Sequence, residues 1–218
     1  MRAGVSSILG GRCALGQDTA LGAEPADGPG LGEFLSEVHA LARDQVRGGG
    51  EGESTYLMSV ATALTRMSAP GSGMREAMRA FRNEHGQEGE RFPIAAVVMD
   101  LQPGGGFTHH DHRDYNGIIL GLGGEVRIRN YDILGDEAVP PKGSTFQVRE
   151  TRDDLILPGR FSMLARRAEN VHDLVAGPEG GRVLDLFTYY AKGARSYFMD
   201  VDAQPRDEER RIHDAAWK

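Results

Sequence analysis

The stretch GGGFTHHDHRDYNGIILGLGGEVRIRNYD, residues 104–132, combines three closely spaced histidines with a pattern typical of β-strands. Residues 116–134 carry an apolar run, a glycine pair and then alternating apolar and polar side chains, which predicts two strands around a glycine turn. His110 and His112 are two positions apart, so an extended strand places both imidazoles on one face. His109 then points to the opposite face.

The sequence on either side of this stretch also favours strands. Residues 94–101 form a continuous apolar run, as expected for a buried strand. Shorter strand-like segments, separated by Pro and Gly turn signals, lie at residues 145–149, 154–157, 161–165, 171–175 and 182–190. Many short strands without intervening helices indicate an all-β sandwich or barrel.

The region before residue 91 has a different pattern. Helical spacing of apolar side chains predicts helices over residues 31–47, 54–67 and 73–83. We therefore expect a disordered or loosely ordered arm at 1–30, a helical extension at 31–90 packed on the barrel, and a barrel at 91–205. The charged tail at 206–218 is expected to form a short surface helix or a frayed end.

Composition excludes several classes of protein. The 218 residues have a net charge of −7 and no basic cluster, which argues against nucleic acid and anionic membrane surfaces as partners. The longest apolar runs are far below the roughly 18 residues of a transmembrane helix. Cys13 is the only cysteine, which excludes an internal disulfide and a cysteine-rich zinc site. The N-terminus is a poor export signal, and we expect a cytoplasmic monomer.

A third histidine, His172, follows His112 by 60 residues. Two imidazoles on one strand face, joined by a third from a distant strand, are a typical ligand set for a divalent transition metal. The alternative for His110 and His112 is a chance pair at the surface, and for His172 it is a packed or hydrogen-bonded side chain. The spacing of all three together favours a metal site.

The spacing Gly104-x5-His110-x-His112-x3-Asn116-x6-Gly123 resembles the first motif of the cupin family, with Asn116 where a carboxylate usually stands. In the second motif only His172 is kept, because Arg167 and Glu169 occupy the Pro and Gly positions. Cupins are double-stranded β-helix barrels, which agrees with the mainly β fold expected from the strand pattern. Asn116 is expected to be a weak ligand or to support the ligands from behind.

The absence of the usual carboxylate has a chemical consequence. The common non-heme Fe(II) site has two histidines and one carboxylate. A third neutral imidazole in place of the carboxylate leaves the protein ligands uncharged. Fe(II) in such a site keeps its full positive charge and attracts an anionic ligand such as a thiolate.

Several short motifs in the same order also resemble the thiol dioxygenases of the cysteamine dioxygenase and plant cysteine oxidase family. The motifs cover roughly residues 92–200, and they are His110-Asp111-His112, the strand ending in Tyr131-Asp132, Asn170-Val171-His172, Val183-Leu184-Asp185-Leu186 and Arg195-Ser196-Tyr197-Phe198. The chain departs from the family at Ser196, where some members have a cysteine that crosslinks to tyrosine. It also lacks the family's double proline after the aspartate and has Phe187-Thr188-Tyr189-Tyr190 instead.

The resemblance implies an Fe(II) dioxygenase that adds both atoms of O2 to a small aminothiol or to the N-terminal cysteine of a peptide, giving a sulfinate. His110, His112 and His172 would bind the iron. Asp185 would lie near the substrate, although a salt bridge explains a carboxylate in an apolar strand equally well. Tyr189 or Tyr190 would line the pocket, and strand alternation allows only one of them to do so.

Two other functions fit the same residues. The first is a cupin metalloenzyme of another class, namely a Mn, Zn or Ni isomerase, decarboxylase or C–C oxygenase, because three histidines do not select iron. The second is a non-catalytic ligand-binding cupin.

Overall fold

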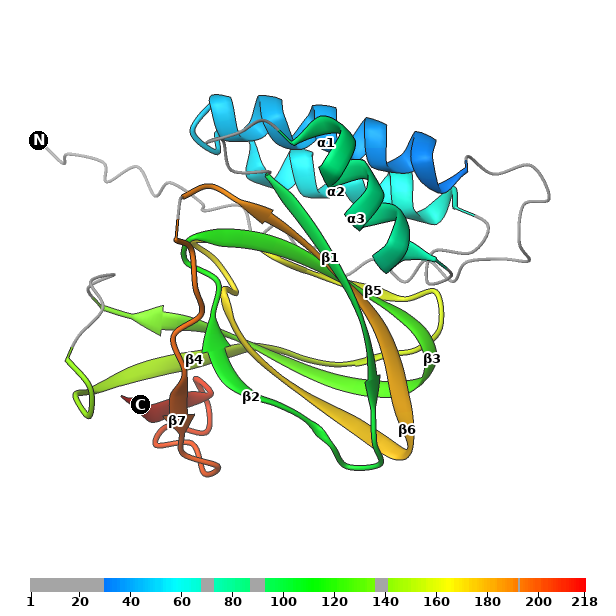
Figure 1. The fold of residues 1–218 in the computed structure, drawn as a ribbon. Coiled ribbons are helices and arrows are strands. Elements are labelled where there is room, and N and C mark those ends of the chain that lie inside the picture. Colours follow the sequence, from blue (N-terminus) through cyan, green and yellow to red (C-terminus); the bar gives the residue numbers. More distant parts are fainter. Residues whose placement is uncertain (1–29, 68–72, 87–92, 136–140, 192) are drawn as a thin grey trace, which may run out of the picture.

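The computed structural model describes residues 30–67, 73–86, 93–135, 141–191 and 193–218. It has the predicted fold class: a curled, mainly antiparallel β-sheet, shaped like a half-barrel, preceded by three helices (Figure 1). The arm expected at residues 1–30 lies almost entirely outside the described residues, as does Cys13.

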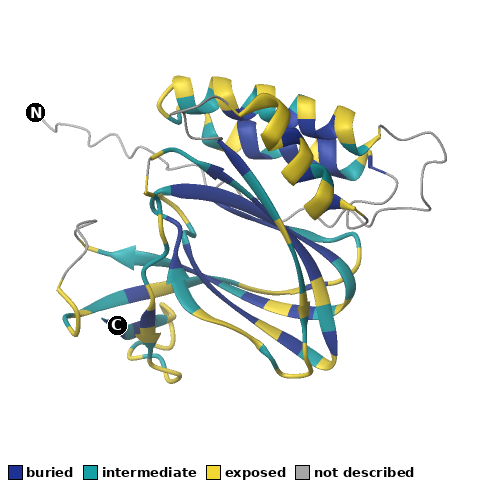
Figure 2. Cartoon of the chain, viewed as in Figure 1, coloured by how far each residue is buried: buried dark blue, intermediate teal, exposed yellow. Residues whose placement is uncertain are grey.

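The three predicted helices are confirmed as α1 (Leu31–Arg47), α2 (Glu53–Thr65) and α3 (Met74–His85). They lie together over one face of the sheet, with their apolar sides buried against it and against one another (Figures 1 and 2). Within the described part of the chain, no helix is long and apolar enough to cross a membrane.

The sheet contains eight strands, and all its pairings are antiparallel. The strands are β1 (Ile94–Leu101), β2 (Gly106–Asp111), β3 (Tyr115–Leu134), β4 (Thr145–Ile156), β5 (Phe161–Leu164), β6 (Val171–Tyr189), β7 (Met199–Val201) and β8 (Ile212–Trp217). They follow the order β1-β6-β3-β4-β8-β7, with β2 also paired to β6 and β5 to β3.

Strands β3 and β6 are longer than predicted. The glycine pair at 123–124 was expected to reverse the chain, but β3 continues through it, and β6 likewise joins the two strands expected at 171–175 and 182–190. The two strands pair along almost their whole length, with register shifts at Gly121/Gly123 and at Gly124/Val126. The glycines therefore form irregularities that bend a continuous ladder, as β-bulges do, instead of ending it.

The prediction for the C-terminal tail is wrong. Residues 212–217 form β8, which pairs with both β4 and β7. His213, Ala215 and Trp217 alternate with more exposed residues and are buried, which is strand periodicity. The charged run from 206 to 211 hid this short pattern, because those residues form the turn that leads into the strand.

Side-chain alternation gives the paired strands β3 and β6 two different faces. On the convex face, apolar side chains pack against the helices; these are Ile118, Leu120, Leu184 and Leu186. On the concave face, apolar side chains form a second cluster, which includes Ile119, Val126, Ile128, Leu174 and Val183. His172 and Leu174 stand two positions apart on β6, where they pair with Asn130 and Ile128 of β3. Alternation therefore places His172 on the same face as Leu174, which is the concave face.

Candidate metal centre

His110, His112 and His172 come together in the structure, as the sequence predicted. Their ligand nitrogens all lie within 4.8 Å of one another, an arrangement that could hold a metal ion. The Nε2 atom of His110 is 3.0 Å from Nε2 of His172 and 3.4 Å from Nε2 of His112. For metal–nitrogen bonds of about 2.1 Å, two nitrogens at angles between a right angle and the tetrahedral angle lie about 3.0–3.4 Å apart. Both distances therefore suit a shared ion.

Strand pairing explains how distant parts of the sequence supply these side chains. His110 pairs directly with His172 in the β2–β6 ladder, which places their side chains on the same face. His112 lies just beyond the end of β2, and its backbone N–H donates a hydrogen bond to the carbonyl of Asn170 at 2.8 Å. This bond holds the end of β2 against the start of β6.

Burial keeps the three imidazoles neutral. His112 and His172 are almost completely buried, and burial sets the pKa of each well below its usual value of 6.5, with a smaller lowering from the neighbouring imidazoles. Burial also lowers the pKa of His110. A metal ion binds the neutral form of histidine, so these three side chains can bind a metal at neutral pH without first losing a proton.

The second ring nitrogens differ among the three ligands. Nδ1 of His110 lies 2.9 Å from the carbonyl oxygen of Thr108, which favours the tautomer with Nε2 free for a metal. The Nδ1 atoms of His112 and His172 are buried without a hydrogen-bond partner among the described residues. The orientation of these two rings therefore depends mainly on packing.

The neighbouring residues His109 and Asp111 point away from the ligand group. His109 lies 3.4 Å from the Tyr131 hydroxyl and 3.7 Å from Asp173, as its alternate facing predicted. Asp111 is fully buried, contacts the Arg113 guanidinium, and accepts a hydrogen bond from the Tyr197 backbone N–H at 2.9 Å. Asp111 therefore connects the β2 end to the segment before β7.

Glu169 explains one departure from the second cupin motif. Its φ is +54°, in the left-handed region that favours glycine, and it stands where the motif has a glycine. Two contacts hold this residue in place: its N–H donates to Asp132 at 2.7 Å, and its carboxylate pairs with Arg152 at 2.9 Å. The glycine-type turn before His172 is thus kept without glycine.

Asp185 lies on the concave face, where it pairs in register with Ile119. Its side chain is buried, and Oδ1 has no hydrogen-bond partner among the described residues. Burial raises the pKa of Asp185 well above its usual value of 3.8. The sequence left two roles open for Asp185, a salt bridge or a position near the substrate. Among the described residues, no basic side chain forms a salt bridge with it.

The two tyrosines at the end of β6 face opposite sides of the sheet. Tyr189 pairs in register with Tyr115 on the concave face, with ring centres 5.5 Å apart. Tyr190 lies on the helix side, where its hydroxyl accepts a hydrogen bond from Asn116 at 2.7 Å and Arg166 covers its ring. Asn116 also donates to Glu53 of α2 at 2.9 Å, so it supports the helices and not the histidines.

Three aromatic residues next to the histidines were not predicted as catalytic or metal-binding residues. The ring of Tyr115 lies 4.2 Å from His112, that of Phe187 lies 6.0 Å from His112, and that of Phe198 lies 5.3 Å from His110. The signal for Phe187 was available, because it stands two positions after Asp185 on the same strand. Tyr115 reaches this face through its pairing with Tyr189, which the sequence does not show. Phe198 comes from the irregular segment before β7, which has no periodicity to read.

No family model matches the chain, and no curated protein matches it. Among solved structures, recombinant oxalate oxidase in complex with glycolate is similar at 19% identity and a TM-score of 0.34, over 46% of this chain and 44% of that chain. Pumpkin seed globulin is similar at 14% identity and a TM-score of 0.38, over 49% and 24%. Coconut allergen cocosin follows at 15% identity and 0.36, over 49% and 24%.

The aligned segment spans less than half the length of each of these proteins. At such scores the similarities assign no activity to this chain, and membership of the thiol dioxygenase family stays a prediction. The site itself is a three-histidine group that could hold a metal ion.

Proposed function

We propose that this chain is an Fe(II)-dependent dioxygenase that adds both atoms of O2 to a thiol and releases a sulfinate. The proposal rests on the composition of the ligand group, which is three buried, neutral imidazoles. No carboxylate belongs to this group in the part of the chain that the structure describes. A metal held by this group keeps its positive charge, which favours binding of a thiolate. Iron, when bound there, would supply the chemistry by which a thiolate and O2 react at adjacent positions.

The fit of iron to the site rests on the donor set. Imidazole suits iron as well as zinc, copper and nickel, and three ligands on one side leave positions open for substrate. The separations of 3.0 and 3.4 Å between Nε2 atoms agree with ligands on one side of an ion.

The concave face supplies the groups that would hold the substrate. Burial raises the pKa of Asp185, which favours the protonated carboxyl group, and in that form it can donate a hydrogen bond. Tyr115 and Phe187 form an aromatic wall beside His112, which would exclude water from the reacting sulfur. The Tyr115 hydroxyl is hydrogen bonded to Ser196, and burial raises its pKa, so it stays protonated.

The direct test is oxygen consumption by the iron-loaded protein. The full chain would be purified without oxygen, loaded with Fe(II), and exposed to O2 with a panel of small aminothiols and peptides that begin with cysteine. We expect O2 uptake together with a mass gain of two oxygen atoms on the thiol. His112→Ala should abolish both, and His109→Ala should retain them.

Zinc as the tightly held metal, together with no O2 uptake for any thiol under Fe(II), would contradict the proposal. Turnover of a non-thiol substrate with Mn, Zn or Ni would instead support a cupin metalloenzyme of another class.

A further inference from the structure

The histidine group is open to solvent on the side of His110. His112 and His172 are buried, whereas His110 is partly exposed. A molecule that approaches the group from solvent therefore meets the imidazole of His110 and the side chains that surround it. These neighbours decide which molecules are held there.

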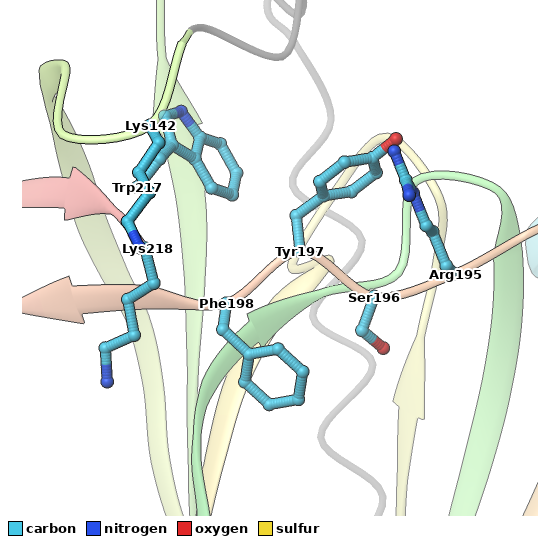
Figure 3. Close-up of a pocket in the computed structure, with 7 residues that line it drawn as sticks. All are labelled: Lys142, Arg195, Ser196, Tyr197, Phe198, Trp217 and Lys218. Carbon is cyan, nitrogen blue, oxygen red and sulfur yellow. The ribbon is translucent and has the colours of Figure 1, made fainter.

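Phe198 is the neighbour of His110 on the side away from β6. The two residues form an antiparallel bridge, which places both side chains on the concave face. The ring of Phe198 lies 5.3 Å from the imidazole, and the residue is 45% exposed. Figure 3 shows that Phe198 and Ser196 point to one side of their segment, while Arg195 and Tyr197 point to the other. The side with Phe198 and Ser196 is the one that faces the histidines.

Phe107 is the second exposed aromatic residue beside the group. It pairs in register with Leu174, and the next regular pair along β2 joins His110 to His172. The irregularity between these pairs places Phe107 and His110 on the same face, although they are three positions apart. On β6 the same span covers two residues, or about 7 Å. Phe107 is 41% exposed, so its ring is open to a ligand about 7 Å from His110.

Hydrogen bonds fix the position of Phe198. The N–H of Asp111 donates to the carbonyl of Tyr197 at 3.1 Å, and the N–H of Tyr197 donates to the Asp111 carboxylate at 2.9 Å. On the side that faces the histidines, the Ser196 hydroxyl is hydrogen bonded to that of Tyr115. A surface that is already in place loses less entropy when a ligand binds.

Phe107 and Phe198 are the two aromatic members of the six large apolar residues that are exposed in the described part of the chain. Both lie on the face of the ligand group and next to its exposed member. Contact with an apolar group would remove both rings from water, which is favourable. A polar group at the same place gains no hydrogen bond from either ring.

We propose that Phe107 and Phe198 form a subsite for an apolar group of the substrate. This inference rests on the proposed thiol dioxygenase function. In an extended peptide the first and third side chains point to the same side and lie about 7 Å apart. A peptide whose N-terminal cysteine has its sulfur at the histidines thus places its third side chain beside the two rings. The preferred substrates are therefore thiols with an aliphatic or aromatic group at this distance.

Binding can be measured without turnover by using peptides that have no thiol. The probes are Ser-Gly-Leu and Ser-Gly-Asn amides, whose third side chains have nearly the same shape and differ in polarity. Calorimetry with the Fe(II)-loaded protein, in the absence of oxygen, gives the affinity of each. We expect about 10-fold tighter binding of the leucine peptide. In the double variant Phe107→Ala/Phe198→Ala the two affinities should differ by less than about 3-fold.

The matched control is Leu155→Ala/Val175→Ala, which also removes two exposed apolar side chains. Both residues pair in register with Arg127, whose neighbour Ile128 is on the concave side, so they lie on the other face of the sheet. The control should keep the preference of the wild type for the leucine peptide. Equal binding of the two probes by the wild type, binding of neither, or the same preference in the double phenylalanine variant would overturn the proposal.

A second measurement separates this inference from the proposed function. Cys-Gly-Leu and Cys-Gly-Asn amides would be compared as substrates by O2 uptake. We expect a kcat/KM about 10-fold higher for the leucine peptide, a preference that is lost in Phe107→Ala/Phe198→Ala. The ratio is measured on one sample, so a partly folded or partly loaded variant does not alter it. Oxidation of both thiols at equal rates would refute the apolar subsite and leave the dioxygenase function standing. Selective binding of Ser-Gly-Leu amide without oxidation of any thiol would do the reverse.

Discussion

Asp185 is a carboxyl group buried on the concave face of the sheet, and its ionisation couples the stability of the fold to pH. Burial alone raises its pKa, and no cation among the described residues offsets the effect. Above the usual pKa of 3.8 the unfolded chain releases this proton while the folded chain keeps it. The folded state then binds more protons than the unfolded state, so stability falls as pH rises toward the folded pKa.

This sign gives a prediction for Asp185→Asn in the metal-free protein. The variant removes the titration, so its free energy of unfolding relative to wild type should increase by up to about 1.4 kcal/mol per pH unit as the pH rises from about 4 toward the folded pKa of Asp185. Urea unfolding of both proteins at several pH values measures the difference, in which the titration of the histidines cancels. A wild type that gains stability over the variant with rising pH would instead indicate a paired, ionised Asp185.

The three histidines give a second prediction at the level of single residues. His110→Ala, His112→Ala and His172→Ala each remove one nitrogen from the ligand group, and each should weaken Fe(II) binding by at least about 100-fold. His109→Ala should bind Fe(II) like the wild type, because its ring contacts Tyr131 and Asp173 instead. Anaerobic calorimetry with Fe(II) provides the measurement. Unchanged affinity in any one of the three variants would remove that residue from the site.

At this scale the sequence could predict which side chains of a strand share a face, because period-two alternation is a local property of a strand. Alternation separated His110 and His112 from His109, and it allowed only one of Tyr189 and Tyr190 on the concave face. The contacts of Asn116 could not be predicted, because they are made with α2 and with the end of β6. A motif position indicates a role in the family pattern, but it does not say which face of the strand the side chain occupies.

Glycines decide the shape of the long strands β3 and β6. Gly124 has a φ of +61°, and a Cβ at this position would lie 2.4 Å from the carbonyl oxygen of Gly180. Two backbones approach closely here, at the irregularity in the β3–β6 ladder. Only a residue without a side chain allows both the left-handed conformation and this contact.

Gly124→Ala should therefore destabilise the fold by about 3–5 kcal/mol, through backbone strain together with the steric clash. The control is Gly104→Ala, where φ is +67° but a Cβ would meet no atom within 4 Å. That substitution introduces only the strain and should cost about 1–2 kcal/mol. Urea unfolding measures both values. Equal losses would mean that the close approach to Gly180 contributes nothing.

The kinds of element were predictable from the sequence, whereas the continuity of the strands was not. A glycine pair between two apolar segments is compatible with a turn and with a bulge, and only the partner strand decides between them. In this fold β6 carries its own glycines at 177, 180 and 181 opposite those of β3, so the ladder continues through both. The prediction for the tail was wrong for a related reason. Residues 212–217 form a strand because they pair with β4 and β7, which are distant in the sequence or irregular in pattern.

At the scale of the whole molecule, the protein has two layers with different tasks. The helices cover the convex face of the sheet (Figures 1 and 2). The concave face carries the histidine group, Asp185 and the aromatic rings of Tyr115 and Phe187. Glu53 of α2 joins the two layers. Its carboxylate accepts hydrogen bonds from Asn116 at 2.9 Å and from the Nε and backbone N–H groups of Arg166, both at 3.2 Å.

The last prediction tests whether this junction acts only on stability. Glu53→Gln removes the charge from a pair whose side chains are 14% and 18% exposed, and it should lower the free energy of unfolding by about 1–3 kcal/mol. Glu37→Gln breaks the ion pair with Arg66, in which both partners are 39–50% exposed, and should cost less than about 1 kcal/mol.

Because Asn116 and Tyr190 lie on the helix side of the sheet, both variants should keep the Fe(II) affinity of the wild type in anaerobic calorimetry. The histidines are held by strand pairing between β2 and β6, which Glu53 does not touch. A loss of metal affinity in Glu53→Gln, but not in Glu37→Gln, would contradict this separation. The helical layer would then set the geometry of the ligands as well as the stability of the fold.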